Sequence, residues 1–139
     1  MAHRPSAGEV FRYPFLWKRE QIAGETEGRK KRPVCIAVTV ARNDAETLVF
    51  ILPITTQRPS PARRVIEVPQ IESQRVGLEV HVRKWIILDE INTDIVERSY
   101  VWDDRQPIGR FSPSFTAQIQ SSLIALARAK GASVVDRIK

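Results

Sequence analysis

The sequence predicts a mainly β fold with one C-terminal helix, an α+β domain built as a small β-barrel or half-barrel. Short apolar segments rich in β-branched residues recur through the first two thirds of the chain, and such residues favour strands. Turn-forming residues separate these segments, whereas one long segment near the C-terminus repeats its apolar residues at helical spacing. A length of 139 residues suits a single domain, because one core commonly serves about 100–200 residues.

The N-terminal part predicts a leader, a strand and a long connection. Residues 1–8 are small and polar and include chain-breaking residues, so we expect a flexible leader before a single domain over residues 9–139. Residues 9–13 predict the first strand of that domain. Residues 14–33 predict a long polar loop, and loops of this length in small domains commonly carry function.

The centre of the sequence predicts three further strands. Residues 34–40 are β-branched and almost entirely apolar, which is typical of a strand covered on both faces. Residues 42–46 predict a turn, because their Asn and Asp side chains bond their own backbone, and residues 47–55 predict the next strand. Residues 65–68 predict a short strand, and residues 69–77 predict one helical turn that ends at a glycine.

The last part of the chain predicts two more strands and the closing helix. Residues 85–89 and 91–96 predict strands, with a continuation at residues 100–102. The helix is expected over about residues 113–130, because Ser112 is a favourable N-cap and a proline occupies the first helical position. One face of this helix carries four regularly spaced apolar residues, Phe115, Ile119, Leu123 and Leu126.

Composition excludes several classes of protein. At 42% hydrophobic and 27% charged residues, the chain resembles an ordinary globular protein. A single cysteine, Cys35, excludes an intramolecular disulfide and a multi-cysteine zinc site, and it fits a reducing, cytoplasmic compartment. No apolar run approaches the roughly 20 residues that span a bilayer, and the N-terminus lacks the apolar core of an export signal. We therefore expect no membrane association.

Standard catalytic signatures are missing. No glycine-rich loop ends in Lys-Ser or Lys-Thr, and no glycine-patterned dinucleotide motif follows a strand, which argues against an NTPase or a dinucleotide enzyme. The two histidines, His3 and His81, lie in polar segments where an exposed, non-catalytic role is expected. No His, Asp and Glu cluster has the spacing of metal ligands. We therefore expect neither a metal nor a cofactor.

Polar residues at the ends of two long strands offer a different chemistry. Arg32 precedes the first central strand, where a guanidinium can hold a phosphate by paired hydrogen bonds and stabilise charge on its oxygens. Thr55, Thr56 and Gln57 end the next strand, where hydroxyls and an amide can bond phosphate, ribose or base. The alternative roles are less specific: residues 29–32 form a solvated basic loop, and the threonines saturate backbone groups of a turn.

The net charge of +6, from 22 Lys and Arg against 16 Asp and Glu, is compatible with a polyanionic partner. The basic residues concentrate in residues 29–32, which include Lys31, and in residues 58–64. These two segments flank the strand ends that carry Arg32 and Thr55 and so form a candidate RNA track. A solvated surface with a mild basic excess is the alternative.

The order of these residues resembles the MazF/PemK family of toxin endoribonucleases, the toxin halves of bacterial toxin–antitoxin pairs. The resemblance spans roughly residues 8–95. Its segments are GEVF at residues 8–11, Gly24-Glu25, Gly28, Arg-Pro with an apolar strand at residues 32–38, LPITTQ at residues 52–57, and residues 85–90. Each motif is common by itself, and their order along the chain gives the resemblance its specificity.

The resemblance implies an SH3-like barrel, a homodimer and metal-independent cleavage of single-stranded RNA, neutralised by a cognate antitoxin that covers the RNA groove. Arg32 would be the essential arginine, which offsets charge and protonates the leaving oxygen, and Thr55 the essential threonine, which holds the phosphate. Glu25 would act as base or position the ribose. The other candidates for RNA contact are Lys31, Thr56, Gln57, Asp89 and Glu90.

The chain departs from the family pattern in the first loop. Residues 14–33 exceed the usual loop length, residues 16–21 look inserted, and Tyr13 replaces a common aspartate. Trp17, within the insertion, would stack on an exposed base or cap the barrel mouth or dimer interface. Two other functions remain open: a non-catalytic nucleic-acid-binding or regulatory module, such as an inactive toxin homologue, and a barrel that binds an extended acidic peptide. The paired arginine and threonine favour the enzyme.

Overall fold

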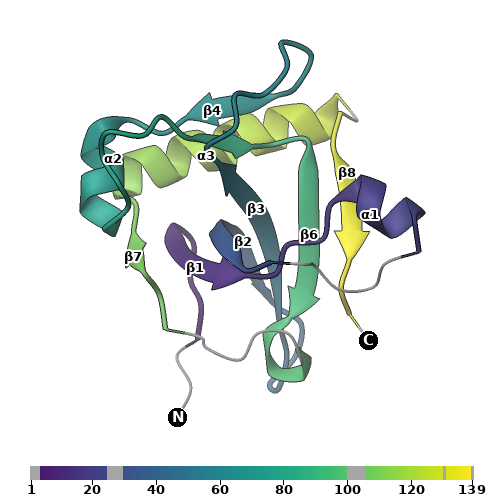
Figure 1. Ribbon diagram of the computed structural model, residues 1–139. Helices are drawn as coiled ribbons and strands as arrows, with labels where there is room; N and C mark the ends of the chain where they lie inside the picture. Colours follow the sequence, from purple (N-terminus) through teal and green to yellow (C-terminus); the bar gives the residue numbers. More distant parts are fainter. Residues whose placement is uncertain (1–3, 25–29, 100–105, 130, 139) are drawn as a thin grey trace.

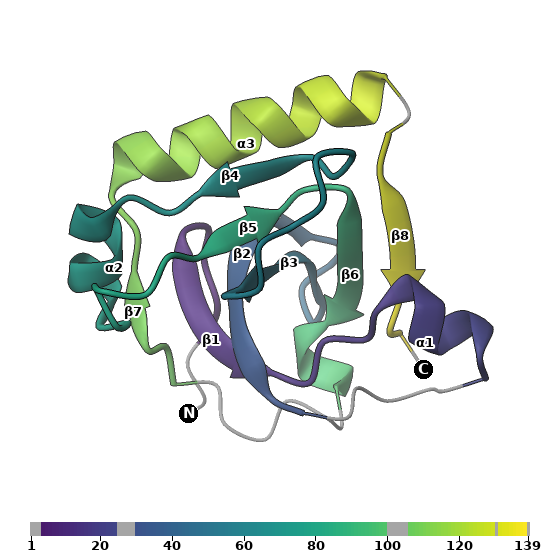
Figure 2. The same ribbon diagram turned by 45° about the horizontal axis from the view of Figure 1, so that its top comes forward.

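The fold is known from a computed structural model, which describes residues 4–24, 30–99, 106–129 and 131–138. Within these residues a mainly antiparallel eight-stranded sheet is joined by the long helix α3 (Pro113–Arg128), which confirms the α+β class and the C-terminal helix. The sheet curls, as Figures 1 and 2 show, but its described strands do not close into a barrel, because β4 and β7 end the main path of pairing. None of the helices in the described part of the chain could cross a bilayer.

The strands are β1 (Glu9–Tyr13), β2 (Arg32–Ala41), β3 (Thr47–Thr55), β4 (Val65–Glu67), β5 (Trp85–Ile87), β6 (Glu90–Ile95), β7 (Gly109–Arg110) and β8 (Ser133–Asp136). The remaining helices are α1 (Lys18–Ile22), α2 (Gln70–Val76) and the 3₁₀ turn η1 (Val96–Arg98). The strands follow the order β4-β5-β3-β2-β1-β7, and β6 pairs with both β3 and β8. Only the pairing of β6 with β8 is parallel among the described strands.

Most of the expected elements are present, with ends that differ by one or two residues. The helical turn expected over residues 69–77 is α2, and Gly77 ends it with a φ of 81°. The structure adds α1 inside the long connection, together with β7 and β8. The strand continuation expected at residues 100–102 lies outside the described residues. Residues 5–8, expected to belong to a flexible leader, are partly or fully buried, and the Gly8 N–H donates to the Ile36 carbonyl at 2.8 Å.

Apolar side chains form two clusters on opposite faces of the curled sheet, because successive strand residues point to opposite faces. The cluster beneath α3 includes Val10, Cys35, Leu52, Phe115 and Ile119. The cluster on the other face includes Phe11, Val34, Ile36, Ile51 and Trp17. Trp17 belongs to this second cluster and also lines the cavity described below.

The start of α3 is fixed by two side chains. Ser112 Oγ accepts the N–H of Phe115 at 3.2 Å, which confirms the expected N-cap. The buried carboxylate of Glu72, in α2, accepts the Ser112 N–H at 2.8 Å and its hydroxyl at 2.7 Å. These bonds fasten α2 to α3, and thereby hold the helix against the face of the sheet opposite the second cluster.

Candidate functional site

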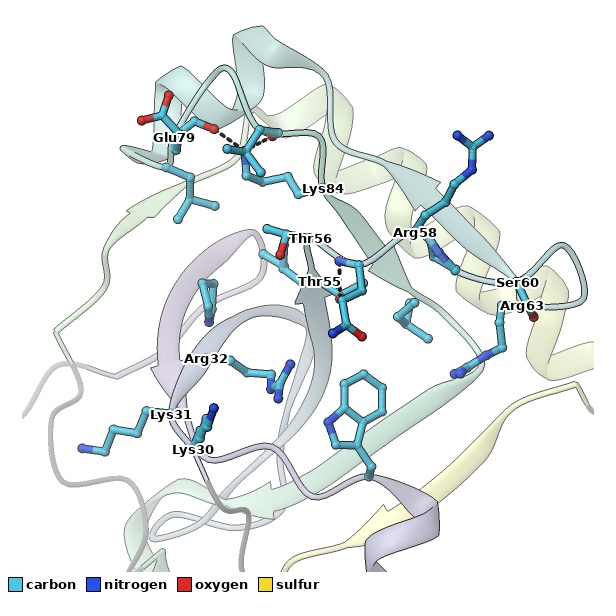
Figure 3. A pocket seen from close by; sticks show the side chains of 18 of the residues that line it. Lys30, Lys31, Arg32, Thr55, Thr56, Arg58, Ser60, Arg63, Glu79 and Lys84 are labelled. Atoms are coloured by element: carbon cyan, nitrogen blue, oxygen red, sulfur yellow. Dashed lines mark hydrogen bonds between the residues drawn. The ribbon is translucent and has the colours of Figure 1, made fainter.

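Arg32 and Thr55 line the same cavity, which has a volume of about 690 Å³ and opens where β2 begins and β3 ends (Figure 3). The pairing of these strands ends at Val34 and Pro53, and Arg32 and Thr55 each lie two residues beyond it, paired with Tyr13 of β1 and Trp85 of β5. Side chains two residues apart on a strand point to the same face of a sheet. The sheet therefore brings together the two residues that the sequence motifs singled out.

The cavity is strongly basic. Among the described residues, seven Lys and Arg side chains and one carboxylate line it: Arg19, Lys30, Lys31, Arg32, Arg58, Arg63, Lys84 and Glu79. In Figure 3, Lys30 and Lys31 lie on the side of Arg32, and Arg58 and Arg63 lie across the cavity. The Glu79 carboxylate accepts the backbone N–H of His81 at 3.1 Å, within its own loop. This distribution of charge favours an anionic ligand.

The Thr55 hydroxyl accepts a hydrogen bond at the end of β3. Its Oγ1 accepts the N–H of Gln57 at 3.1 Å, which is the turn-saturating role considered above. A hydroxyl that accepts one hydrogen bond still carries a proton that it can donate. Thr56 and Gln57 also line the cavity, so the expected group of strand-end residues stays together.

Trp17 forms a wall of the cavity beside Arg32. The Arg32 guanidinium carbon lies 5.2 Å from the Trp17 ring centroid, and that of Arg19 lies 5.4 Å from it. The edge of the Phe15 ring packs against the indole, with 5.1 Å between centroids, and Trp17 is only 7% exposed. The indole is therefore a buried support for two cations rather than an open platform for stacking a base.

The segment that carries Trp17 is anchored by buried hydrogen bonds to residues distant in the sequence. Asn92, in β6, accepts the Leu16 N–H at 2.9 Å and donates to the Leu16 carbonyl at 2.8 Å. Arg137, just after β8, donates to the Pro14 carbonyl at 2.9 Å and to Asn92 Oδ1 at 3.1 Å. These bonds hold the backbone of Pro14 and Leu16, the residues that directly precede Trp17.

Lys84 is a buried cation in the wall of the cavity, and sequence reasoning missed it. Its Nζ donates to Ser73 Oγ at 3.2 Å, to the Val82 carbonyl at 2.7 Å and to the Glu79 carbonyl. Burial lowers the pKa of Lys84 below its ordinary value. Three acceptors fix this ammonium group, so Lys84 shapes the loop above the cavity. No local motif distinguishes this lysine from its basic neighbours.

Asp89 and Glu90 have structural partners. Arg63 Nη2 lies 2.7 Å from Asp89 Oδ1 and 3.4 Å from Glu90 Oε1, and Arg63 Nε donates to Asp89 Oδ1 at 3.0 Å. Asp89 Oδ2 also accepts the Arg64 N–H at 3.0 Å. The hydrogen bond to Asp89 raises the pKa of Arg63 above its ordinary value. Neither carboxylate lines the cavity, whereas Arg63 does. Glu25 lies outside the described residues.

The basic segment of residues 58–64 contributes Arg58 and Arg63 to the cavity, as its concentration of charge led us to expect. Arg19 was not foreseen, because it lies on the short helix α1 that the sequence did not predict. In the part of the chain that the structure describes, no three potential metal-ligating side chains cluster. Searches of protein-family models and of curated proteins find no match to this chain.

Proposed function

We propose that this chain is a toxin-type endoribonuclease, similar to the MazF/PemK family, that binds single-stranded RNA in the basic cavity and cleaves it. The observation that carries the proposal is that Arg32 and Thr55 line one cavity together with further basic side chains. Phosphate-rich strands gain affinity from such a lining because they release bound counterions. The motif resemblance supplies the class of reaction.

The proposed reaction is an attack of the RNA 2′-hydroxyl on the adjacent phosphorus. The 2′-oxygen bonds to phosphorus and gives its proton to a base, while the bond from phosphorus to the 5′-oxygen breaks and that oxygen takes up a proton from water. The products are a cyclic phosphate and a 5′-hydroxyl. Negative charge grows on the non-bridging oxygens during this step, and fixed donors that meet it lower the barrier.

The residues of the cavity divide these tasks. Arg32 offers a cation and N–H donors to the non-bridging oxygens, and Thr55 donates its hydroxyl proton to the same phosphate. Guanidinium groups keep their protons in water. We therefore assign Arg32 the role of stabilising charge, in preference to the role of donating a proton. Glu25 is proposed as the base from the resemblance alone.

The proposal is tested by incubating the purified chain with mixed single-stranded RNA in EDTA, beside Arg32→Ala and Thr55→Ala. We expect cleavage by the unsubstituted chain and a loss of about 100-fold or more in each variant, the scale seen when one preorganised donor is removed. Arg12→Ala is the matched control, because Arg12 is exposed on β1 and does not line the cavity. Undiminished cleavage in the Arg32 and Thr55 variants would contradict the site.

A non-catalytic RNA-binding module is the second candidate. It is favoured by the composition of the cavity, because Glu79 is the one carboxylate among the described lining residues and it bonds the His81 N–H of its own loop. Binding of RNA that depends on Arg32, with no cleavage of any RNA, would select this candidate.

The resemblance also leads us to propose a homodimer and a cognate antitoxin with an acidic segment. Such a segment would carry the charge that the cavity favours, and would compete with RNA for Arg32 and its basic neighbours. A complex with the antitoxin that leaves RNA binding undiminished would contradict this part of the proposal.

A further inference from the structure

We propose that Val82 and Leu78 form a base-binding subsite, on which a nucleobase of the bound strand packs while its phosphates contact the basic walls of the same cavity. Both side chains line the cavity of about 690 Å³ that also holds Arg32 and Thr55. Small-molecule pockets measure about 300–1,000 Å³, so a base has room in this cavity beside a phosphate. This inference rests on the proposed function for the identity of the strand.

The Val82 side chain is accessible to a ligand. It is 43% exposed, and of the exposed large apolar side chains in the described part of the chain it alone lines the cavity. Val82 also lines a neighbouring cavity of about 450 Å³, so its methyl groups can be reached from either cavity. Leu78 is half-buried and packs against the cluster beneath α3. The two residues therefore offer an open apolar surface that is continuous with the core.

The loop of residues 78–84 forms a different wall of the cavity from the one that carries Arg32. In Figure 3, Glu79 and Lys84 of this loop lie across Thr55 from Arg32 and its neighbouring lysines. The exposed Glu79 carboxylate repels phosphate. Lys84 Nζ has three N–H donors, and it donates to Ser73 Oγ and to the carbonyls of Glu79 and Val82. This wall therefore suits a phosphate less well than the wall of Arg32 does.

A nucleotide is divided between charge and apolar surface in the same way as the cavity. Its phosphate is an anion, whereas the faces of its base pack against aromatic or apolar side chains. Contact between a base and the methyl groups of Val82 and Leu78 removes apolar surface of both partners from water, which favours binding. We therefore assign the wall of residues 78–84 to a base, and the wall of Arg32 to phosphate.

The subsite is held in position before a ligand binds. The Val82 carbonyl accepts a hydrogen bond from Lys84 Nζ at 2.7 Å, and the Leu78 N–H donates to the Ser73 carbonyl at 2.9 Å. Both anchoring residues are buried, since Lys84 is 4% and Ser73 1% exposed. A surface that is fixed in this way loses little conformational freedom on binding. Lys84 thus positions the wall on which the base packs.

The test measures the Kd of the chain for two fluorescein-labelled probes of equal length and equal charge. One probe is a single-stranded DNA of mixed sequence, which lacks the 2′-hydroxyl and so cannot be cleaved by the proposed reaction. The other carries the same phosphates on abasic tetrahydrofuran residues. We expect the unsubstituted chain to bind the mixed-sequence DNA more tightly than the abasic probe, because only the DNA offers bases to the subsite.

Val82→Ala removes two methyl groups from the proposed contact and changes no charge. We expect this variant to raise the Kd for the mixed-sequence DNA about fivefold, the effect of losing the burial of one to two methyl groups, and to leave the Kd for the abasic probe unchanged. Val82→Ile keeps a β-branched apolar side chain, so we expect its Kd for the DNA to be no higher than that of the unsubstituted chain.

Val40→Ala is the matched control. Val40 is 42% exposed on β2 and does not line the cavity, so we expect both Kd values to equal those of the unsubstituted chain. Arg58→Ala provides the contrasting pattern. Arg58 is an exposed cation that lines the cavity, so its removal should raise the Kd for both probes by the same factor.

An unchanged Kd of Val82→Ala for the mixed-sequence DNA, or an equal rise for both probes as in Arg58→Ala, would overturn the base-binding subsite and leave the roles of Arg32 and Thr55 unaffected. Equal affinity of the unsubstituted chain for the two probes would overturn it as well. Failure of the unsubstituted chain to bind either the DNA or RNA would overturn the proposed function, and the subsite with it. The same titrations therefore distinguish the two failures.

Discussion

Arg32 and Thr55 line one cavity, each two residues beyond Val34 and Pro53, the last pair of β2 and β3. Beyond this pair the two strands separate, since Arg32 pairs with Tyr13 of β1 and Thr55 with Trp85 of β5, and both side chains line the cavity. Thr55 Oγ1 keeps one hydrogen bond, from the Gln57 N–H at 3.1 Å. The hydroxyl thus has a fixed position and a donor proton.

Thr55→Val and Thr55→Ser separate the hydroxyl from the shape of the side chain. Valine keeps the shape and removes the donor, so we expect cleavage to fall about 100-fold. Serine keeps the donor and the bond from Gln57, so we expect cleavage within a few fold of the unsubstituted chain. Initial rates on one RNA, with thermal unfolding as a check of stability, give the measurement. Equal rates for valine and serine would remove Thr55 from the site.

Asp89→Asn tests whether Asp89 contacts RNA or only holds Arg63. The carboxylate accepts three hydrogen bonds from Arg63 and one from the Arg64 backbone, and it compensates the charge of Arg63. Asparagine removes that charge, so the cavity becomes more positive. We expect RNA to bind more tightly to Asp89→Asn at low salt, with a steeper dependence of Kd on salt concentration. Weaker binding at an unchanged salt dependence would identify Asp89 as an RNA contact.

The strong local patterns of the sequence were sufficient to predict much of the fold. β2 and β3 are long and apolar, α3 begins at Ser112 with a proline behind it, and α2 ends at Gly77, where a positive φ suits glycine. Arg32 and Thr55 could be chosen from motif order, because strand ends are where polar side chains escape the core. Their meeting in one cavity depends on how β2 and β3 pair, which the sequence does not state.

The elements that were missed depend on distant contacts. α1 has only five residues and buries none of them, so its own propensity is too weak to predict it. β8 is four residues long and exists by pairing in parallel with β6, far away in the chain. Lys84 acquires its role from acceptors on a folded loop, and Asp89 from an arginine 26 residues earlier. Local sequence patterns do not indicate partners that are so distant in the chain.

Cys35 is expected to be unreactive in the folded chain. It is completely buried between the sheet and α3, and burial raises the pKa of its thiol to about 12. The thiolate is the reactive form, so at pH 8 we expect no reaction with a disulfide reagent until urea unfolds the chain. Ser121→Cys is the control, because Ser121 is exposed on α3 and its thiol should react at once. Rapid labelling of Cys35 without denaturant would indicate local opening of this core.

Asp94 predicts a pH dependence of stability. Its Oδ2 accepts the Tyr13 hydroxyl at 2.7 Å and its Oδ1 accepts the Ile95 N–H at 2.9 Å, but burial dominates and raises its pKa above the ordinary 3.8. The folded chain therefore binds this proton more tightly than the unfolded chain does. The contribution of Asp94 to the free energy of unfolding must then decrease as the pH rises from about 3.8.

The measurement compares urea unfolding of the unsubstituted chain and Asp94→Asn at several pH values between about 4 and 7. We expect the difference in unfolding free energy, unsubstituted minus variant, to become smaller as the pH rises. Asp44→Asn, in an exposed turn, serves as the control. A difference that grows with pH would mean that the ionised carboxylate is the stabilised form.

Arg137 connects the end of the chain to the candidate site. It is 5% exposed, donates to the Pro14 carbonyl and to Asn92 Oδ1, and has its guanidinium carbon 5.4 Å from the Tyr13 ring centroid. Arg137→Met keeps an unbranched apolar side chain and removes both hydrogen bonds, which the single nitrogen Nη1 donates. We expect a loss of about 1.5–3 kcal/mol in the free energy of unfolding, as for hydrogen bonds from a charged group.

The effect should also reach the cavity, because Asn92 and Arg137 together hold the backbone that precedes Trp17. Hydrogen exchange of residues 15–18 is expected to become faster in Arg137→Met, and the Kd for single-stranded DNA to rise. Arg128→Met, exposed at the end of α3, should leave all three quantities unchanged. Destabilisation without faster exchange in residues 15–18 would show that Arg137 supports β8 alone, and that the indole is held by Phe15 and Asn92.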